Sequence, residues 1–133
     1  MFQWKLNIEG KSKVIHNPSW EEVYNVLKSM DGDEVTQADL ESEDLGFLMV
    51  CGGDYIEERD ERAYCVEYYP KNGNETFELV NPLVDTEDEY LFITVEKVGV
   101  DHPAETCVDF KSVVQAFQHF YKTGKLDDNL IWE

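Results

Sequence analysis

The residues with the most capacity for chemistry in this chain of 133 residues are its 29 acids, three cysteines and three histidines. The cysteines and histidines are Cys51, Cys65, Cys107, His16, His102 and His119. Zinc binding requires several such side chains at short spacing, and these are scattered along the chain. The sequence therefore predicts no metal site and no cofactor, and it predicts that the three cysteines are buried and reduced.

The usual motifs of nucleophilic catalysis and phosphate binding are missing. No Gly-x-Ser-x-Gly elbow and no Gly-x-x-x-x-Gly-Lys-Ser/Thr loop occurs, and His102 and Glu105 do not have the spacing of a zinc deaminase. Gly52 and Gly53 end an apolar run, where a glycine pair is typical of a bulge or turn. We therefore predict no catalytic residue and no enzymatic activity. A carboxylate pair in an unmarked pocket stays open as an alternative, because among so many acids any chosen pair is uninformative.

The charge balance points to a basic protein as partner. Against 29 acids stand 11 Lys and Arg, giving a net charge of −18. Such a charge disfavours direct binding to nucleic acid or anionic membranes and attracts a basic partner. The chain also has no apolar run long enough to cross a membrane and no secretion leader, so we expect a cytoplasmic protein.

The acids are concentrated rather than spread evenly. Residues 31–62 contain twelve acids and two arginines, a local balance of −10. Within this stretch, residues 54–61 form a predicted acidic loop in which Tyr55 and Ile56 interrupt the carboxylates, as in a contact surface with buried anchors. The predicted partner-binding residues are Asp54, Tyr55, Glu57, Glu58, Asp60 and Glu61, with Asp85, Glu87, Asp88 and Glu89 as a second edge. The alternative is a solvated surface that only maintains solubility. The acidic segments do not follow the pattern of a calcium-binding loop.

Apolar periodicity predicts an α+β fold, mostly an antiparallel meander, with one early and one C-terminal helix packed on it as a single domain over residues 1–133. The helices are expected at residues 20–30 and 110–122, with Gly124 as a left-handed cap. After an opening hairpin within residues 2–16, strands are expected at residues 46–51, 62–69, 76–80, 90–98 and 105–110. An Asn72-Gly73 hairpin turn and a turn at residues 100–103 separate some of them.

The last third of the chain carries a family pattern. Ala116-x-x-x-Phe120 lies in the second helix, Thr123-Gly124 ends it, and Leu130-Ile131-Trp132 follows almost at the terminus. Pro18-Ser19 leads the first helix, and residues 79–82 read Leu-Val-Asn-Pro. Together these features resemble the family numbered first among the immunity proteins of bacterial polymorphic toxin systems. The residues of the C-terminal pattern are also those that a packed helix and its docked tail require.

This resemblance implies a small α+β protein that binds and neutralises the C-terminal domain of a cognate toxin, often a deaminase or nuclease. It assigns no toxin-contacting residue. A toxin acting on nucleic acid presents a basic cleft, which an acidic protein can cover. The alternative function is an acidic nucleic-acid mimic that inhibits or regulates another nucleic-acid enzyme. Exposed strand edges leave homodimerisation open.

Overall fold

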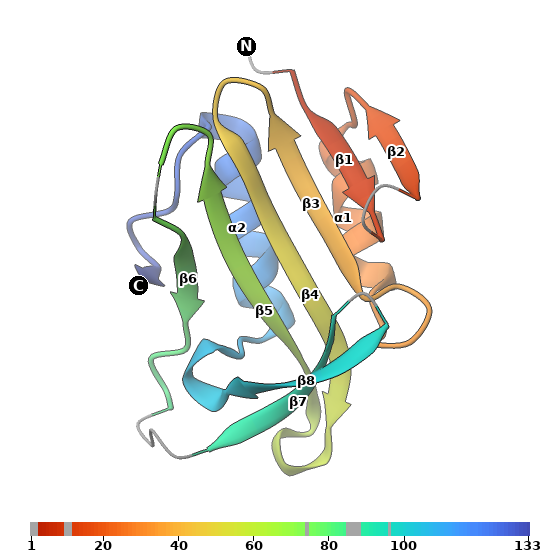
Figure 1. The fold of residues 1–133 in the computed structure, drawn as a ribbon, viewed down its shortest axis with the longest axis vertical. Coiled ribbons are helices and arrows are strands. Elements are labelled where there is room, and N and C mark those ends of the chain that lie inside the picture. The colour runs from red at the N-terminus through yellow and green to blue at the C-terminus, as the bar shows by residue number, and fades with distance from the viewer. Residues whose placement is uncertain (1–2, 10–11, 74, 85–88, 96) are drawn as a thin grey trace.

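Seven antiparallel strands form one sheet in the computed structural model, and both α-helices lie against the same face of it (Figure 1). The structure describes residues 3–9, 12–73, 75–84, 89–95 and 97–133. The sheet has the order β2-β1-β3-β4-β5-β6-β9. Its strands are β1 (Lys5–Ile8), β2 (Lys13–His16), β3 (Gln37–Ser42), β4 (Gly46–Ile56), β5 (Glu61–Pro70), β6 (Phe77–Val80) and β9 (Ile131–Trp132). The predicted α+β architecture is confirmed.

Both predicted helices are present within one residue of their expected bounds, and side-chain caps start both of them. The side chain of Ser19 accepts a hydrogen bond from the Glu22 N–H, and the Glu22 side chain accepts one from the Ser19 N–H, which starts α1 (Trp20–Ser29). Asp109 caps α2 (Phe110–Thr123) by accepting from the Ser112 N–H. Gly124 ends α2 in the left-handed conformation, with φ 73°.

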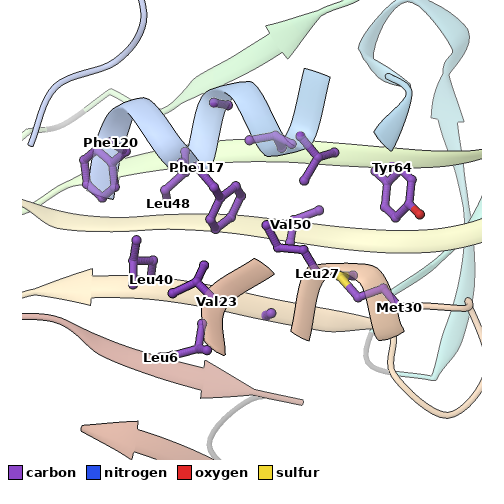
Figure 2. Close-up of a cluster of buried hydrophobic side chains, with 14 of the residues drawn as sticks. Leu6, Val23, Leu27, Met30, Leu40, Leu48, Val50, Tyr64, Phe117 and Phe120 are labelled. Carbon is purple, nitrogen blue, oxygen red and sulfur yellow. The ribbon is translucent and has the colours of Figure 1, made fainter. Parts of the chain in front are cut away.

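The main core fills the space between the sheet and the helices. Figure 2 shows Leu6 and Leu40 from the sheet meeting Val23 of α1, while Phe117 of α2 packs over the neighbouring strands. Successive residues of a strand point to opposite faces, so the apolar residues of β3, β4 and β5 that join this core alternate with residues on the other face.

A separate hairpin covers part of that other face. Its strands β7 (Tyr90–Val95) and β8 (Val98–Pro103) cross one end of β4 and β5 on the side away from the helices (Figure 1). Ile93 of β7 is fully buried there and packs with Ala63 and Cys65 of β5. The rest of this face is not covered by the hairpin.

The structure differs from the sequence prediction in several segments. The predicted strand over residues 90–98 is two strands, and the predicted turn at residues 100–103 lies inside β8, because pairing with β7 satisfies its backbone. The predicted strand over residues 105–110 is wrong: the 3-10 helix η2 (Ala104–Thr106) replaces it after Pro103, and Val108 alone bridges to Tyr64. The strands β3 and β9 were not predicted.

Candidate functional site

The predicted acidic loop is in fact the tip of a long hairpin between β4 and β5. Tyr55 and Ile56 are the last residues of β4, the 3-10 helix η1 (Glu57–Arg59) makes the turn, and Glu61 is the first residue of β5. Asp60 takes the left-handed conformation, with φ 52°. Residues 54–61 are called the acidic tip below.

A glycine bulge extends β4 beyond its predicted end. Gly52 and Gly53 have φ of 104° and 96°, and the register between β4 and β5 shifts between Gly52 and Asp54. A Cβ atom at Gly53 would lie 2.8 Å from the Met30 carbonyl oxygen. Only glycine fits both the conformation and the space, so the predicted bulge is confirmed.

The bulge brings the Asp54 side chain to β7. One Asp54 carboxylate oxygen accepts from the Thr94 N–H at 2.9 Å, and the other accepts from the Thr94 hydroxyl at 2.7 Å. These bonds hold the β7–β8 hairpin against the sheet. Asp54 therefore serves the fold of this chain, and its predicted contact with a partner stays a prediction.

Two arginines hold the acidic tip in place. The Arg59 guanidinium donates to the Cys107 carbonyl at 3.0 Å and the Ala104 carbonyl at 3.3 Å. The Arg62 guanidinium donates to the Gly53 carbonyl at 2.6 Å and the Asp31 carbonyl at 3.1 Å. A surface fixed in this way loses little conformational entropy when a partner binds.

Most of the other predicted residues of the tip are open to solvent. Glu57, Glu58, Asp60 and Glu61 are exposed, and 52% of the Tyr55 surface is accessible. The Tyr55 hydroxyl donates to the Asp60 carboxylate, and this bond raises the pKa of Tyr55. Ile56 is instead largely buried in the small cluster around Ile93, so Tyr55 is the more exposed of the two predicted anchors.

The acidic tip and β7 enclose an open groove of about 950 Å³. Its lining residues are Tyr55, Ile56, Glu57, Glu58, Arg59, Glu89, Tyr90, Leu91 and Phe92. Glu89 is exposed and lies in this lining, so the fold brings it to the first group of predicted acids, whereas Asp85, Glu87 and Asp88 lie outside the described residues. We call this surface the acidic groove.

Two aromatic residues of the groove were missed at the sequence level. Tyr90 is 60% exposed and Phe92 is 63% exposed. The sequence shows that Tyr90 and Phe92 alternate with Leu91 and Ile93 and so lie on the opposite face of the strand, but β7 is apolar on both faces. The sequence could not indicate which face the sheet would cover. Exposed aromatics beside carboxylates are typical of a protein-binding surface.

The three cysteines lie in the interior of the protein. All three cysteines are buried and free of disulfides, as predicted. The Sγ atoms of Cys65 and Cys107 lie 3.8 Å apart, and this contact, together with burial, raises the pKa of Cys65. Within the described part of the chain, no group of three or more His, Cys, Asp or Glu side chains could hold a metal ion.

Most of the apolar residues of the C-terminal pattern lie in the core or pack against it, and none of them lines the groove. Ala116 and Phe120 of α2 are fully buried, and the Trp132 indole donates to the Asp127 carbonyl at 3.2 Å. Trp132 also pairs with Leu79, which adds β9 to the edge of the sheet.

A comparison with known families decides the assignment. The model of the family described as Immunity protein Imm1 matches residues 12–133. The chain belongs to the Imm1 immunity protein family. This confirms the resemblance given by the C-terminal pattern, and membership supports an immunity role with a cognate toxin as partner.

Two further observations concern this immunity protein. No curated protein matches it. Among the residues that the structure describes, no helix is long and apolar enough to cross a membrane. The Imm1 match does not assign a binding residue, so the acidic groove is identified by its chemistry alone.

Proposed function

We propose that this immunity protein neutralises a toxin domain that acts on nucleic acid, and that it does so by covering the toxin's basic substrate cleft. The observation that carries the proposal is the acidic groove, in which carboxylates stand beside exposed aromatic side chains. A cleft that binds phosphates presents Lys and Arg, which these carboxylates can pair with.

The two kinds of residue have different tasks. Glu57, Glu58, Asp60, Glu61 and Glu89 attract the basic cleft from a distance and pair with its cations. Tyr55, Tyr90 and Phe92 bury apolar area once the two proteins touch. Asp85, Glu87 and Asp88 extend the acidic edge in the same proposal. The immunity protein acts by occupancy, has no catalytic step of its own, and works in the cytoplasm, where a nucleic-acid toxin finds its substrate.

The test is a binding measurement with the toxin domain encoded beside this gene. Charge reversal of Glu57, Glu58 and Glu61 to Lys should weaken binding by at least about tenfold, because each desolvated charge contact is worth about 2–5 kcal/mol. The same variant should fail to inhibit the toxin and fail to rescue growth of cells that express it.

A matched control separates a local contact from a general charge effect. Glu21, Glu75 and Asp128 are exposed acids outside the acidic groove. Their reversal to Lys changes the net charge by the same amount and should leave most of the affinity intact. If the two triple variants bind equally well, the acidic groove is only a solvated surface.

A further inference from the structure

The sheet has a second acidic surface, on the face that the helices leave free. The β7–β8 hairpin covers only one end of this face (Figure 1). By register, neighbouring strands place Asn7, Asp39, Met49, Glu67 and Glu78 in one row across the sheet. The adjacent row contains Lys5, Glu41, Phe47 and Tyr69. We call these two rows the open sheet face.

Two carboxylates of this face are placed directly opposite each other. Glu67 of β5 pairs in register with Glu78 of β6, and like charges in that position destabilise a sheet. Partial burial and the charge of Glu67 raise the pKa of Glu78. The Tyr69 hydroxyl donates to the Glu67 carboxylate, which supplies a hydrogen bond but no positive charge.

An aromatic pair lies beside these carboxylates. The rings of Phe47 and Tyr69 stack with centroids 4.7 Å apart and an interplanar angle of 17°. Both residues are half-buried at the surface. Carboxylates next to aromatic faces form a suitable environment for a guanidinium group, which pairs with the former and stacks on the latter.

The other end of the row contains a buried amide with an unsatisfied acceptor. Asn7 is 1% exposed, and its Nδ2 donates to the Asp39 carboxylate at 2.5 Å and to the Glu41 carboxylate at 3.0 Å. Its Oδ1 is buried without a hydrogen-bond partner in the structure. An unpaired buried acceptor is costly, and a donor such as an arginine or lysine side chain would satisfy it after a small rearrangement.

From this arrangement we infer that the open sheet face is a second docking surface, which receives arginine side chains from a basic segment of the toxin domain. The acids Asp39, Glu41, Glu67 and Glu78 form the complementary charge, and the Phe47–Tyr69 pair accepts the flat face of a guanidinium. The inference rests on the proposed function for the identity of the partner.

The face is joined to the acidic groove by the exposed part of the β7–β8 hairpin. Val98 is 62% exposed and Val100 is 41% exposed. Val100 pairs with the buried Ile93, so its side chain points to the same side of the hairpin, towards the sheet. A toxin domain that straddles the hairpin would bury these valines between the two acidic surfaces.

The test uses neutral variants of nearly equal shape. Glu67→Gln together with Glu78→Gln should raise the stability of the free protein, because it removes the opposed charges. The same double variant should bind the toxin domain about tenfold more weakly, because the partner's cations lose their acceptors. Opposite signs for stability and affinity distinguish a docking surface from a purely structural one.

The control is Glu21→Gln with Asp128→Asn, which removes two exposed charges on α1 and in the C-terminal tail. If the Gln pair at positions 67 and 78 binds as tightly as this control, the inference is overturned. In that case a loss of binding in the acidic-groove variants would still support the proposed function.

A second measurement does not depend on the toxin. N-acetyl-arginine amide is titrated into the isotopically labelled protein, with the uncharged N-acetyl-citrulline amide as its matched control. We expect amide resonances of Glu67, Glu78 and Tyr69 to shift with arginine only. This titration tests the inference even if the toxin domain does not bind. Equal resonance shifts with both amides, or no shift with either, would overturn the inference.

Discussion

The carboxylate of Asp54 accepts hydrogen bonds from both the backbone N–H and the hydroxyl of Thr94, 40 residues further along the chain. This pair connects the end of β4 to β7. Together with the burial of Ile93, it holds the β7–β8 hairpin in the position where β7 lines the acidic groove.

Removing the Asp54 side chain should loosen that connection. We expect Asp54→Ala to lower the free energy of unfolding by about 2 kcal/mol, since hydrogen bonds to charged groups contribute roughly 1.5–3 kcal/mol. Thr94→Val should cost less, because it keeps the backbone N–H. Urea denaturation of the single and double variants gives the coupling between them. Strictly additive losses would show that the two residues do not act together.

Replacing Gly53 tests the bulge. Gly53→Ala places a Cβ atom 2.8 Å from the Met30 carbonyl oxygen at φ 96°, so we expect a loss of about 2 kcal/mol or more in the free energy of unfolding. Gly73→Ala is the control, because its added Cβ would lie 3.0 Å from the side chain of Pro70 and requires no left-handed strain. Equal stabilities of the two variants would contradict the assigned role of the bulge.

The pH dependence of stability should reveal the Glu67–Glu78 pair. Since burial and the Glu67 charge raise the pKa of Glu78, the folded state holds that proton more tightly than the unfolded state does. Protonated Glu78 therefore contributes to stability. This contribution is fully present below 4.5, the ordinary pKa of a glutamate, and is lost as the pH rises through the raised pKa of Glu78 in the folded protein.

Glu78→Gln should therefore be more stable than the native chain at neutral pH, and this advantage should shrink in acid. Urea midpoints across that pH range measure the effect, with the exposed Glu75→Gln as control. An advantage of Glu78→Gln that does not change with pH would mean that the Glu78 carboxyl titrates normally.

Association with the toxin domain should depend strongly on salt. Raising the ionic strength from about 0.01 to 0.15 M shortens the Debye length from about 30 to 8 Å, which removes most long-range attraction between a −18 protein and a basic cleft. We expect the association rate constant to fall by at least about tenfold while the dissociation rate constant changes much less. Stopped-flow mixing separates the two constants. An association rate constant that does not change with salt would contradict the proposed attraction between the acidic groove and a basic cleft.

Local sequence signals predicted the parts of the fold that depend on neighbouring residues. Ser19 with Glu22 and Gly124 mark helix ends that the sequence predicted, because capping needs only groups within one turn, whereas Asp109 was placed inside a predicted strand. The prediction for residues 98–103 was wrong, since the pairing that forms β8 and the contact between β4 and β7 depend on tertiary packing.

The candidate site likewise combines features that the sequence predicts with features that only the tertiary structure shows. The sequence by itself determined that the protein is strongly acidic, that Tyr55 stands among carboxylates, and that its C-terminal pattern is that of the Imm1 family. Only the tertiary structure decided that Asp54 and Ile56 turn inward while Tyr90 and Phe92 stay exposed beside Glu89. The physical reason is that burial depends on which surfaces meet across the sheet, and strand alternation marks two faces without saying which one is covered.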